Sequence, residues 1–479
     1  MATQPGTNRK ATLAVVFLVM FLVSLDLSIV NVALPEIDSA FGFGPSGLSW
    51  VINAFMLPFA GLMLLGGRLA DLTGRRTLLL GGLAVFALFS AWGGAAQQGW
   101  ELLIGRAGQG IAAAVLAPMS LALATSEFPE GTQRARAMAV WGGAGAAGGA
   151  VGVVLSGLLT DHLGWRWVMW VNLVFVAGAV IAVLRGVSNV VTRPGRVDAI
   201  GAILVTFGVS ALVLGVIATD RDAWGSPPVL AWFAAGLVAL ALFAVVETRV
   251  SEPLVPLDLL RRRSLIGATV FGFLLVSGQL ASFYFVAQFL QRVLDYSPTR
   301  TGVAFLPFCV GVVVGLRVAM AVILRTGTRP VLLVGGLVGA AGLLWFGQAD
   351  TSTTYLGGLL GPSLVGSLGI GAAMVAMGMA AVTGIEPDRS GLASGILNSA
   401  RQLGGCLGLA VLVTVATRTI GGATDPASLA HGYTTALCLG AALLAVGSVV
   451  AALIVPGRAG ASGGEAARDR VHQAVHGGE

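Results

Sequence analysis

The residue with the clearest chemical potential is Asp26, a carboxylate inside the apolar stretch 11–34. An ionised side chain at the centre of a membrane span costs about 2.5–3.5 kcal/mol on insertion scales, so Asp26 needs a function or a partner. Burial raises the pKa of a carboxyl group and a nearby cation lowers it, so a modest rearrangement can make such an acid take up or release a proton. Asp26 is therefore the first candidate proton carrier, and the alternative is a fixed structural ion pair.

Two arginines at membrane depth are also candidates for a function. Arg106 lies near the start of the stretch 101–125 and is a candidate counter-ion for Asp26. Arg317 lies inside the stretch 301–324 and belongs to no motif that we can name. Its long side chain either reaches the membrane surface or faces a cavity, and both interpretations stay open.

The second and third apolar stretches are joined by a charged loop with the sequence Gly67-Arg68-Leu69-Ala70-Asp71-Leu72-Thr73-Gly74-Arg75-Arg76. Gly74 permits a tight turn, and the arginines hold the loop at the cytoplasmic face. Asp71 can meet a helix N-terminus, where a negative charge is worth about 0.3–1 kcal/mol. The alternative is that these charges only set the topology.

These residues must be positioned by membrane-spanning helices. Of the 479 residues, 56% are hydrophobic and 10% are charged, with a mean hydropathy of +0.88, which excludes a water-soluble globular protein. The apolar runs are continuous and not alternating, so we expect an all-α integral membrane protein and no β-barrel. Fourteen transmembrane helices are predicted, at 11–34, 47–67, 78–97, 101–125, 137–160, 166–185, 197–218, 229–247, 264–289, 301–324, 330–347, 354–382, 391–416 and 432–455.

The basic residues predict the orientation of these spans. Twenty Lys and Arg residues fall on the side of the N-terminus and five fall on the other side, alternating loop by loop. Because cytoplasmic loops carry the excess of positive charge, we expect both termini in the cytoplasm. Arginine in place of lysine, with abundant alanine and glycine, is typical of a GC-rich bacterial genome, so the expected location is a bacterial plasma membrane.

The connectors between spans predict the domain organisation. Basic connectors at 185–196 and 247–263 isolate two spans between two groups of six, and paired six-helix bundles are a common plan of secondary transporters. We expect an N-terminal six-helix bundle at 1–190 and an inserted helix pair with a cytoplasmic connector at 191–263. A C-terminal six-helix bundle at 264–455 and a disordered cytoplasmic tail at 456–479 complete the prediction.

Several function classes are excluded by residue usage. Lys10 is the only lysine and lacks the glycine-rich context of a phosphate-binding loop, so an ion gradient must drive any uphill movement. Cys309, Cys406 and Cys438 lie in apolar stretches and predict neither disulfides nor a metal site. We therefore expect no enzyme activity, no cofactor, no metal, and no nucleotide or nucleic-acid partner.

The loop 67–76 resembles the loop signature of the major facilitator superfamily. Other motifs resemble the fourteen-helix drug:proton antiporter branch of that superfamily. They are the motif around Asp26, the motif around Arg106, the run Trp165-Arg166-Trp167 and the stretch 391–404. The similarity extends over all fourteen spans and implies alternating access between two six-helix bundles.

The resemblance also implies a latch that holds the cytoplasmic side closed. In such a latch Asp71 docks on the start of the thirteenth span, while Arg75 reaches an acid at the end of the fourth, for which Glu127 is available. The candidate latch comprises Gly67, Asp71, Gly74, Arg75, Arg76 and Glu127.

Two positions depart from the family pattern. The stretch 152–157 reads Gly-Val-Val-Leu-Ser-Gly where the branch carries Gly-Pro-x-x-Gly-Gly, which leaves symport and uniport open beside antiport. Phe55 stands where a tyrosine is usual. The candidates for the substrate cavity are Asn31, Asn53, Phe55, Gln109, Gln279, Gln288 and Asn398, in which polar amides among aliphatic walls suit loose recognition.

The sequence therefore predicts a proton-coupled secondary transporter in which Asp26 and Arg106 carry the coupling. Its expected partners are the lipid bilayer, protons and small hydrophobic compounds, such as antibiotics, that it exports. The alternative is a transporter of one defined metabolite, either an exporter or an importer, coupled or facilitative.

Overall fold

The computed structural model describes residues 9–128, 132–188, 199–219, 222–250, 259–386 and 389–457. All regular structure among these residues is helical, and thirteen helices are long and apolar enough to cross a membrane. The helix α2 adds a shorter apolar part at Gly47–Met63. These helices confirm the predicted all-α integral membrane class.

The first half of the chain forms six long helices, followed by a hairpin of two. The six are α1 (Arg9–Phe41), α2 (Gly44–Thr73), α3 (Arg75–Ala95), α4 (Gly99–Ser126), α5 (Thr132–Leu163) and α6 (Arg166–Gly186). The hairpin consists of α7 (Ala199–Ala218) and α8 (Pro227–Arg249). Each lies within a few residues of a predicted span, because an uninterrupted apolar run in hydrocarbon must satisfy its backbone hydrogen bonds as a helix.

The second half holds the remaining helices and two short helical turns. They are η1 (Leu259–Arg261), α9 (Arg263–Arg292), α10 (Pro298–Ala304), α11 (Leu306–Thr326), α12 (Thr328–Phe346), η2 (Tyr355–Leu359), α13 (Leu360–Val382), α14 (Ser390–Ile420) and α15 (Pro426–Ile454). The short 3₁₀ turn η1 precedes α9, and the short π-helical turn η2 precedes α13. The predicted span 301–324 is divided into α10 and α11 at Phe305. Pro307 follows directly, and its missing N–H removes one hydrogen bond from the helix.

The same packing pattern occurs in both halves. In the first, α1 packs on α5 and α6, α2 packs on α4, and α3 packs on α4 and α6. In the second, α9 packs on α14 and α15, α11 packs on α13, and α12 packs on α13 and α15. The two groups of six are therefore structural repeats, as the fold prediction required. The structure does not test the predicted domain limits near 190 and 456 or the tail beyond 457. These positions lie among or next to residues that the structure does not describe, so they stay predictions.

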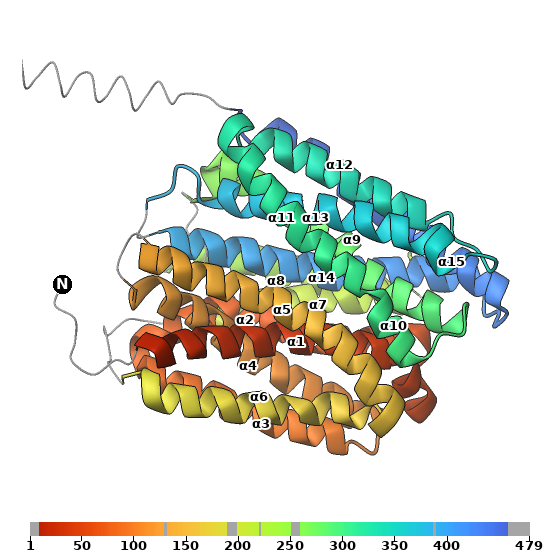
Figure 1. Cartoon of the computed structure of the whole chain (residues 1–479), viewed down its shortest axis with the longest axis horizontal. Helices are drawn as coiled ribbons and strands as arrows, with labels where there is room; N and C mark the ends of the chain where they lie inside the picture. Colours follow the sequence, from red (N-terminus) through yellow and green to blue (C-terminus); the bar gives the residue numbers. More distant parts are fainter. Residues whose placement is uncertain are drawn as a thin grey trace, which may run out of the picture.

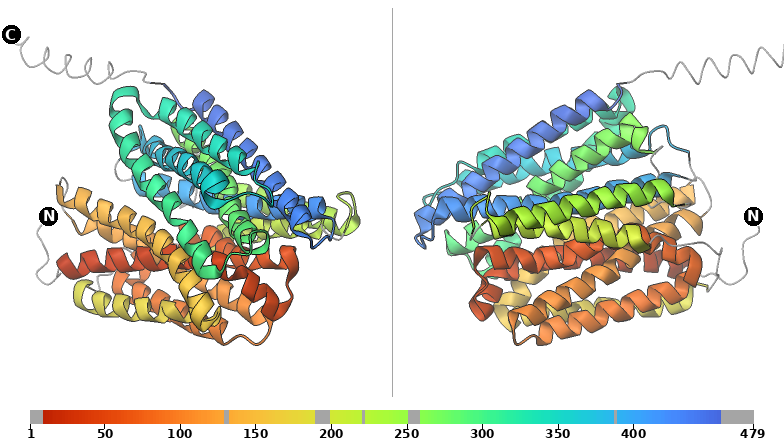
Figure 2. Two further views of the ribbon diagram at one scale, coloured as in Figure 1. Left: turned by 45° about the vertical axis from the view of Figure 1, so that its right-hand side comes forward. Right: turned by 180° about the vertical axis from the view of Figure 1, so that it is seen from behind.

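The two bundles meet along two interfaces. Helix α2 contacts α14 on one side of the molecule, and α5 contacts α10 and α11 on the other. Figure 1 shows the start of α1 and the end of α15 at one end of the molecule, which we call the terminal end. Figure 2 shows that the bundles diverge toward the terminal end and approach each other at the opposite end, which we call the closed end.

The hairpin α7–α8 lies against only one of the two interfaces. Helix α7 contacts both α2 and α14, so it covers the line along which these two helices meet. Arg418 of α14 donates a 2.5 Å hydrogen bond to the carbonyl of Thr219, and its guanidinium lies 5.7 Å from the ring centre of Trp224. The hairpin is thereby attached to both bundles.

Candidate functional site

The two charges predicted to form a pair do so in the core of the N-terminal bundle. Nη1 of Arg106 lies 2.5 Å from Oδ2 of Asp26, and their side chains are 1% and 0% exposed. Separating two such charges in a low-dielectric interior is costly, because each would then be buried without a partner. Helices α1 and α4 are therefore joined by a buried ion pair.

Amide side chains complete the environment of the carboxylate. Nδ2 of Asn172 donates to Oδ1 of Asp26 at 2.7 Å, and Nε2 of Gln109 donates to the same oxygen at 3.1 Å. Oε1 of Gln109 accepts from Arg106 at 2.8 Å, and Nε2 of Gln109 also donates to the hydroxyl of Ser90 at 2.8 Å. Gln109, predicted as a cavity residue, is thus fully buried within this cluster.

Asn172 and Ser90 were not found by the sequence analysis. Each lies within an apolar run in the interior of its helix, α6 and α3 respectively, and both are 0% exposed. Isolated polar residues inside a span are the signal that could have indicated them, because such groups usually find a hydrogen-bond partner in the bundle interior. Four of the six N-terminal helices thus contribute side chains to the cluster of Asp26, Ser90, Arg106, Gln109 and Asn172.

Arg106 has two further partners on α2. Its Nε donates to the carbonyl of Val51 at 3.0 Å, and its guanidinium carbon lies 4.7 Å from the ring centre of Phe55. A desolvated cation over an aromatic face gains about 2 kcal/mol. Phe55, where a tyrosine was expected from the family pattern, therefore offers the arginine its ring face, and these contacts remain when the carboxylate loses its charge.

Glycines bring the backbones close enough for these contacts. A Cβ atom added to Gly110 of α4 would lie 2.1 Å from the carbonyl oxygen of Phe55, so only glycine lets α2 approach α4 here. A Cβ added to Gly105 would lie 2.8 Å from the Cα of Gly93 on α3. The close approach of α4 to α2 and α3 places Val51, Phe55 and Ser90 beside the charged pair. Small residues commonly allow such close packing of membrane helices.

The contacts of Arg106 do not all depend on the carboxylate. The pair Asp26–Arg106 joins α1 to α4, whereas Val51 and Phe55 contact the guanidinium from α2. The amides of Gln109 and Asn172 contact the carboxylate. The cluster therefore links α1, α2, α4 and α6 through one carboxylate and its counter-ion.

The predicted loop latch is partly assembled. Gly74, with φ of +85°, forms the turn between α2 and α3 in a conformation that favours glycine. Nη1 of Arg75 lies 2.9 Å from Oε1 of Glu127 and donates to the hydroxyl of Ser126 at 2.7 Å, so the predicted ion pair is present. Arg76 is half-buried. The predicted residues Gly67 and Asp71 belong to α2, but their side chains lie outside those that the structure describes.

The other predicted cavity residues are divided between the bundles. Asn31 on α1 donates to the carbonyls of Leu27 and Ser28, both at 3.2 Å. Asn53 on α2 is 0% exposed, and neither its amide nitrogen nor its oxygen has a hydrogen-bond partner. In the C-terminal bundle, Gln288 is buried, Gln279 is half-buried, and Asn398 accepts from Arg401 at 3.0 Å. All of these lie on α1, α2, α9 and α14, which border the other bundle.

The closed end is held by contacts between bundles that the sequence did not indicate. Nη2 of Arg292 on α9 lies 2.5 Å from Oδ2 of Asp38 on α1, and Gln291 donates to the carbonyl of Val32 at 3.0 Å. On the α5 side, the backbone N–H of Thr299 donates to the carboxylate of Asp161 at 2.8 Å. We call the pair Asp38–Arg292 the closed-end ion pair.

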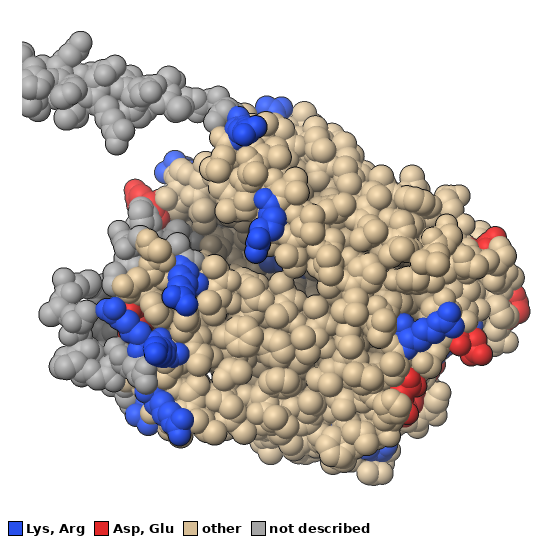
Figure 3. All heavy atoms as spheres, in the orientation of Figure 1, with Lys and Arg blue, Asp and Glu red and all other residues tan. Residues whose placement is uncertain are grey.

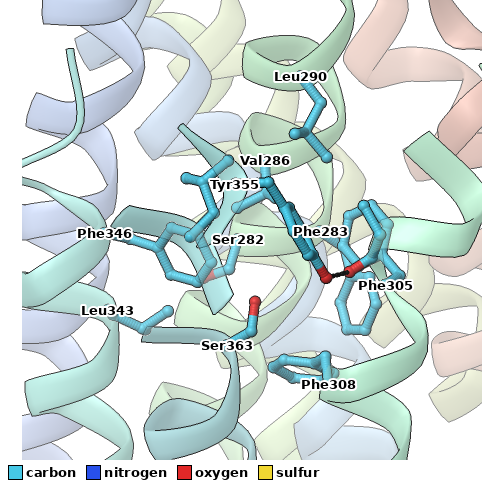
Figure 4. Close-up of a pocket in the computed structure, with 12 residues that line it drawn as sticks. Ser282, Phe283, Val286, Leu290, Phe305, Phe308, Leu343, Phe346, Tyr355 and Ser363 are labelled. Atoms are coloured by element: carbon cyan, nitrogen blue, oxygen red, sulfur yellow. Dashed lines mark hydrogen bonds between the residues drawn. The ribbon is translucent and has the colours of Figure 1, made fainter. Parts of the chain in front are cut away.

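A separate apolar pocket lies inside the C-terminal bundle. In Figure 4, Leu343 and Phe346 approach it from one side, and Phe305 and Phe308 approach it from the other. Tyr355 donates its hydroxyl to the carbonyl of residue 304 at 2.8 Å. The predicted cavity residues do not line this pocket, and its lining carries no charged side chain. Among the described residues, no group of three or more His, Cys, Asp or Glu could hold a metal ion.

The family model of the Major Facilitator Superfamily matches residues 16–409, which include the whole cluster around Asp26 and all three contacts described at the closed end. The chain belongs to the Major Facilitator Superfamily. It is therefore a multi-pass membrane transporter and not an enzyme, as the sequence predicted.

Two relatives of this facilitator-superfamily transporter are named for antibiotic export or resistance. The chain is 39% identical to the cephamycin export protein of Amycolatopsis lactamdurans, with 90% of each chain covered. It is 37% identical to the puromycin resistance protein of Streptomyces alboniger, with 95% of this chain and 93% of the relative covered. A bacterial homologue of the human lysosomal transporter Spinster, solved facing inward and unoccupied, shares the fold with a TM-score of 0.64 at 15% identity, over 95% of this chain and 98% of that one.

Proposed function

We propose that this protein exports small, largely apolar compounds across a bacterial plasma membrane in exchange for protons. The observation that carries the coupling is the buried pair Asp26–Arg106 with its amide partners. A carboxylate at this depth is retained at a cost, and its partners can accommodate either charge state. The relatives named for cephamycin export and puromycin resistance support antibiotics as the substrate class.

The proposed cycle alternates between two arrangements of the bundles. In the structure, the contacts Asp38–Arg292 and Asp161–Thr299 hold the closed end together. The two bundles diverge toward the terminal end. If both termini are cytoplasmic, as the arginine distribution indicates, this arrangement is the inward-open one. Substrate then binds from the cytoplasm or the inner leaflet, and rocking of the bundles exposes it to the outside.

The proton supplies the driving force in this proposal, and no cofactor is needed. Protonation of Asp26 from the outside weakens its pairing with Arg106 and permits the return to the inward-open arrangement. Substrate binding from inside then displaces the proton to the cytoplasm. The ion pair reforms as the proton leaves, so substrate and proton move in opposite directions.

The test uses inside-out membrane vesicles with an acidified lumen and a luminal pH dye. A chemically broad panel of compounds, puromycin included, is added to vesicles that contain the wild type, Asp26→Asn or Asp350→Asn. Asp350 is the control because it is an exposed carboxylate in a loop that is hydrogen-bonded only to Ser352 and Thr353. We expect compound-triggered proton release with the wild type and Asp350→Asn, and none with Asp26→Asn.

Compound counterflow without a proton gradient shows whether Asp26→Asn is folded. A variant that still exchanges labelled compound for unlabelled compound has retained its binding site and its conformational cycle. If Asp26→Asn exchanges compound and also releases protons like the wild type, proton coupling through Asp26 is wrong. If no compound moves protons with the wild type, the alternative of a carrier for one defined metabolite is favoured.

A further inference from the structure

The two interfaces between the bundles differ in what covers them. The line between α2 and α14 is covered by α7, which contacts both helices. On the opposite side no described helix covers the line between α5 and α11, and these two helices make only sparse contact with each other. Figure 3 shows this uncovered side, with a hollow between α5 and α11 that opens toward the terminal end. Among the described helices, the interface between the bundles is therefore covered on the α7 side and uncovered on the side of α5 and α11.

The wall of the hollow on α5 is made of small residues. Gly142 and Gly143 are exposed, and a Cβ atom added to either would meet no atom within 4 Å. Ala139 and Ala146 are exposed on the same part of the helix. The opposite face of α5 packs on α1 through Gly148. An apolar molecule in the hollow would thus meet a smooth surface on the α5 side.

The wall on α11 carries a charge. Arg317 lies nine residues before the end of α11 at Thr326, which is about 14 Å along a helix and places it within the hydrocarbon region. Its neighbours Val313, Val314, Val318 and Met320 are exposed and apolar. Figure 3 shows a basic side chain over α11 beside the hollow.

Arg317 has no acidic partner among the described residues. It is exposed and makes no ion pair with any of the residues that the structure describes. Helices α9 to α15 contain no Asp or Glu at all, so their own bundle offers no carboxylate at this depth. Across the hollow, the acidic residue of α5 is Asp161, near the closed end and bonded to Thr299. A cation at membrane depth is costly without a counter-charge, and an anion from outside the chain would offset that cost.

We propose that the hollow between α5 and α11 admits substrates from the membrane leaflet at the terminal end, and that Arg317 recognises the negatively charged group of an anionic amphiphile. This inference rests on the proposed function, because it names a substrate class for the same transporter. The apolar part of such a molecule lies against Gly142, Gly143 and the exposed valines of α11. Its carboxylate or sulfonate pairs with the guanidinium. Arg317 is therefore a specificity-determining residue and not a fixed structural charge.

The test compares two probes that share a pyrene ring and a four-carbon chain but carry opposite charges, 1-pyrenebutanoic acid and 1-pyrenebutylamine. The purified full-length protein is placed in nanodiscs of phosphatidylcholine, and binding is followed by energy transfer from its tryptophans to the pyrene. Trp141, next to Gly142 on α5, provides a donor beside the hollow. Because the guanidinium attracts the carboxylate of the acid and repels the ammonium group of the amine, we expect the wild type to bind the acid about tenfold more tightly than the amine.

Three variants decide the role of Arg317. Arg317→Gln should bind both probes equally, Arg317→Lys should keep most of the preference for the acid, and Arg325→Gln should behave like the wild type. Arg325 is the matched control because it lies in the last turn of the same helix. Since Arg317 is exposed, its replacement should leave the elution profile and thermal unfolding unchanged. An equal preference for the acid in wild type and Arg317→Gln overturns the proposal.

Two further measurements distinguish a substrate site from a lipid site, and binding from transport. Native mass spectrometry of nanodiscs that contain phosphatidylglycerol tests whether a lipid occupies the site. If the wild type retains that lipid and Arg317→Gln does not, the site binds a lipid headgroup, which contradicts the proposal. Binding does not depend on transport, so a charge preference carried by Arg317 in a protein that exports neither probe and no compound of the panel described above refutes the proposed function alone. Export of both probes with no dependence on Arg317 refutes the inference alone.

Discussion

At the scale of single residues, a carboxylate and its counter-ion are easier to predict than the groups that orient them. Asp26 and Arg106 were predicted because each is a charge within an apolar run. Asn172 was not, because an asparagine in α6 gives no indication that it donates to a residue 146 positions away. Helix pairing, which the sequence does not state, decides which polar groups meet. The chemical type of the site was therefore predictable and its hydrogen-bond network was not.

Two buried asparagines should respond in opposite ways to replacement by leucine. Asn172→Leu removes a hydrogen bond to a buried charge, worth about 1.5–3 kcal/mol, and should lower the temperature of thermal unfolding. Asn53 is equally buried but has no hydrogen-bond partner for either amide atom, so Asn53→Leu should leave that temperature unchanged or raise it. Unfolding of both variants in detergent, followed with a thiol-reactive dye, provides the measurement. Equal losses would mean that Asn172 acts only by filling space.

At the scale of helices, the spans were predictable and their interruptions were not. Hydrocarbon requires each apolar run to form a helix, so the fourteen stretches agree with the helices to within a few residues at most ends. The division of the tenth span at Phe305 depends on Pro307. The short turn η2 before α13 depends on local packing. Hydropathy averages over such features, because a proline in an apolar run hardly changes the mean.

Gly110 should be intolerant of even a single methyl group. A Cβ atom there would lie 2.1 Å from a backbone carbonyl oxygen of α2, so Gly110→Ala must push α2 away from α4. Overpacking of this kind costs about 1–3 kcal/mol, and the shift should also break the contact of Arg106 with Val51. We expect a lower unfolding temperature and compound-driven proton release reduced at least fivefold.

The matched control for this substitution is Gly81→Ala in α3. Gly81 is also helical, but a Cβ atom added to it meets no atom within 4 Å. Because alanine favours helix over glycine by about 1 kcal/mol, Gly81→Ala should preserve or raise stability and leave transport unchanged. If both variants lose transport equally, helix flexibility and not close packing explains the glycines of this bundle.

At the scale of the whole molecule, contacts between the bundles select the arrangement that is observed. Arg292 and Asp38 are separated by 254 residues, and Asp161 and Thr299 by 138, so neither contact follows from local sequence. The internal repeat could be predicted from the connectors, but not which end of the two bundles is shut. That choice depends on small differences between large interfaces, to which a single ion pair contributes measurably.

Breaking the closed-end ion pair should shift the population toward the opposite arrangement. The pair is partly exposed, so we assign it about 1 kcal/mol, which corresponds to about a fivefold change in the ratio of the two arrangements. Spin labels at Thr132 on α5 and Thr326 on α11 report the separation of the bundles at the terminal end, in a background without the native cysteines. In Arg292→Gln, the short distance in double electron–electron resonance should gain population at the expense of the long one.

Reversing both charges tests whether the attraction itself is responsible. Asp38→Arg with Arg292→Asp restores an ion pair with the opposite orientation, so its distance distribution should return toward that of the wild type, while either single reversal should favour closure of the terminal end. If Arg292→Gln leaves the distribution unchanged, the contact of Asp161 with Thr299 is sufficient to hold the closed end. If instead both single reversals and the double reversal behave alike, packing around α1 and α9, and not charge, determines the equilibrium. The double variant thus separates an electrostatic preference for the observed arrangement from a steric one.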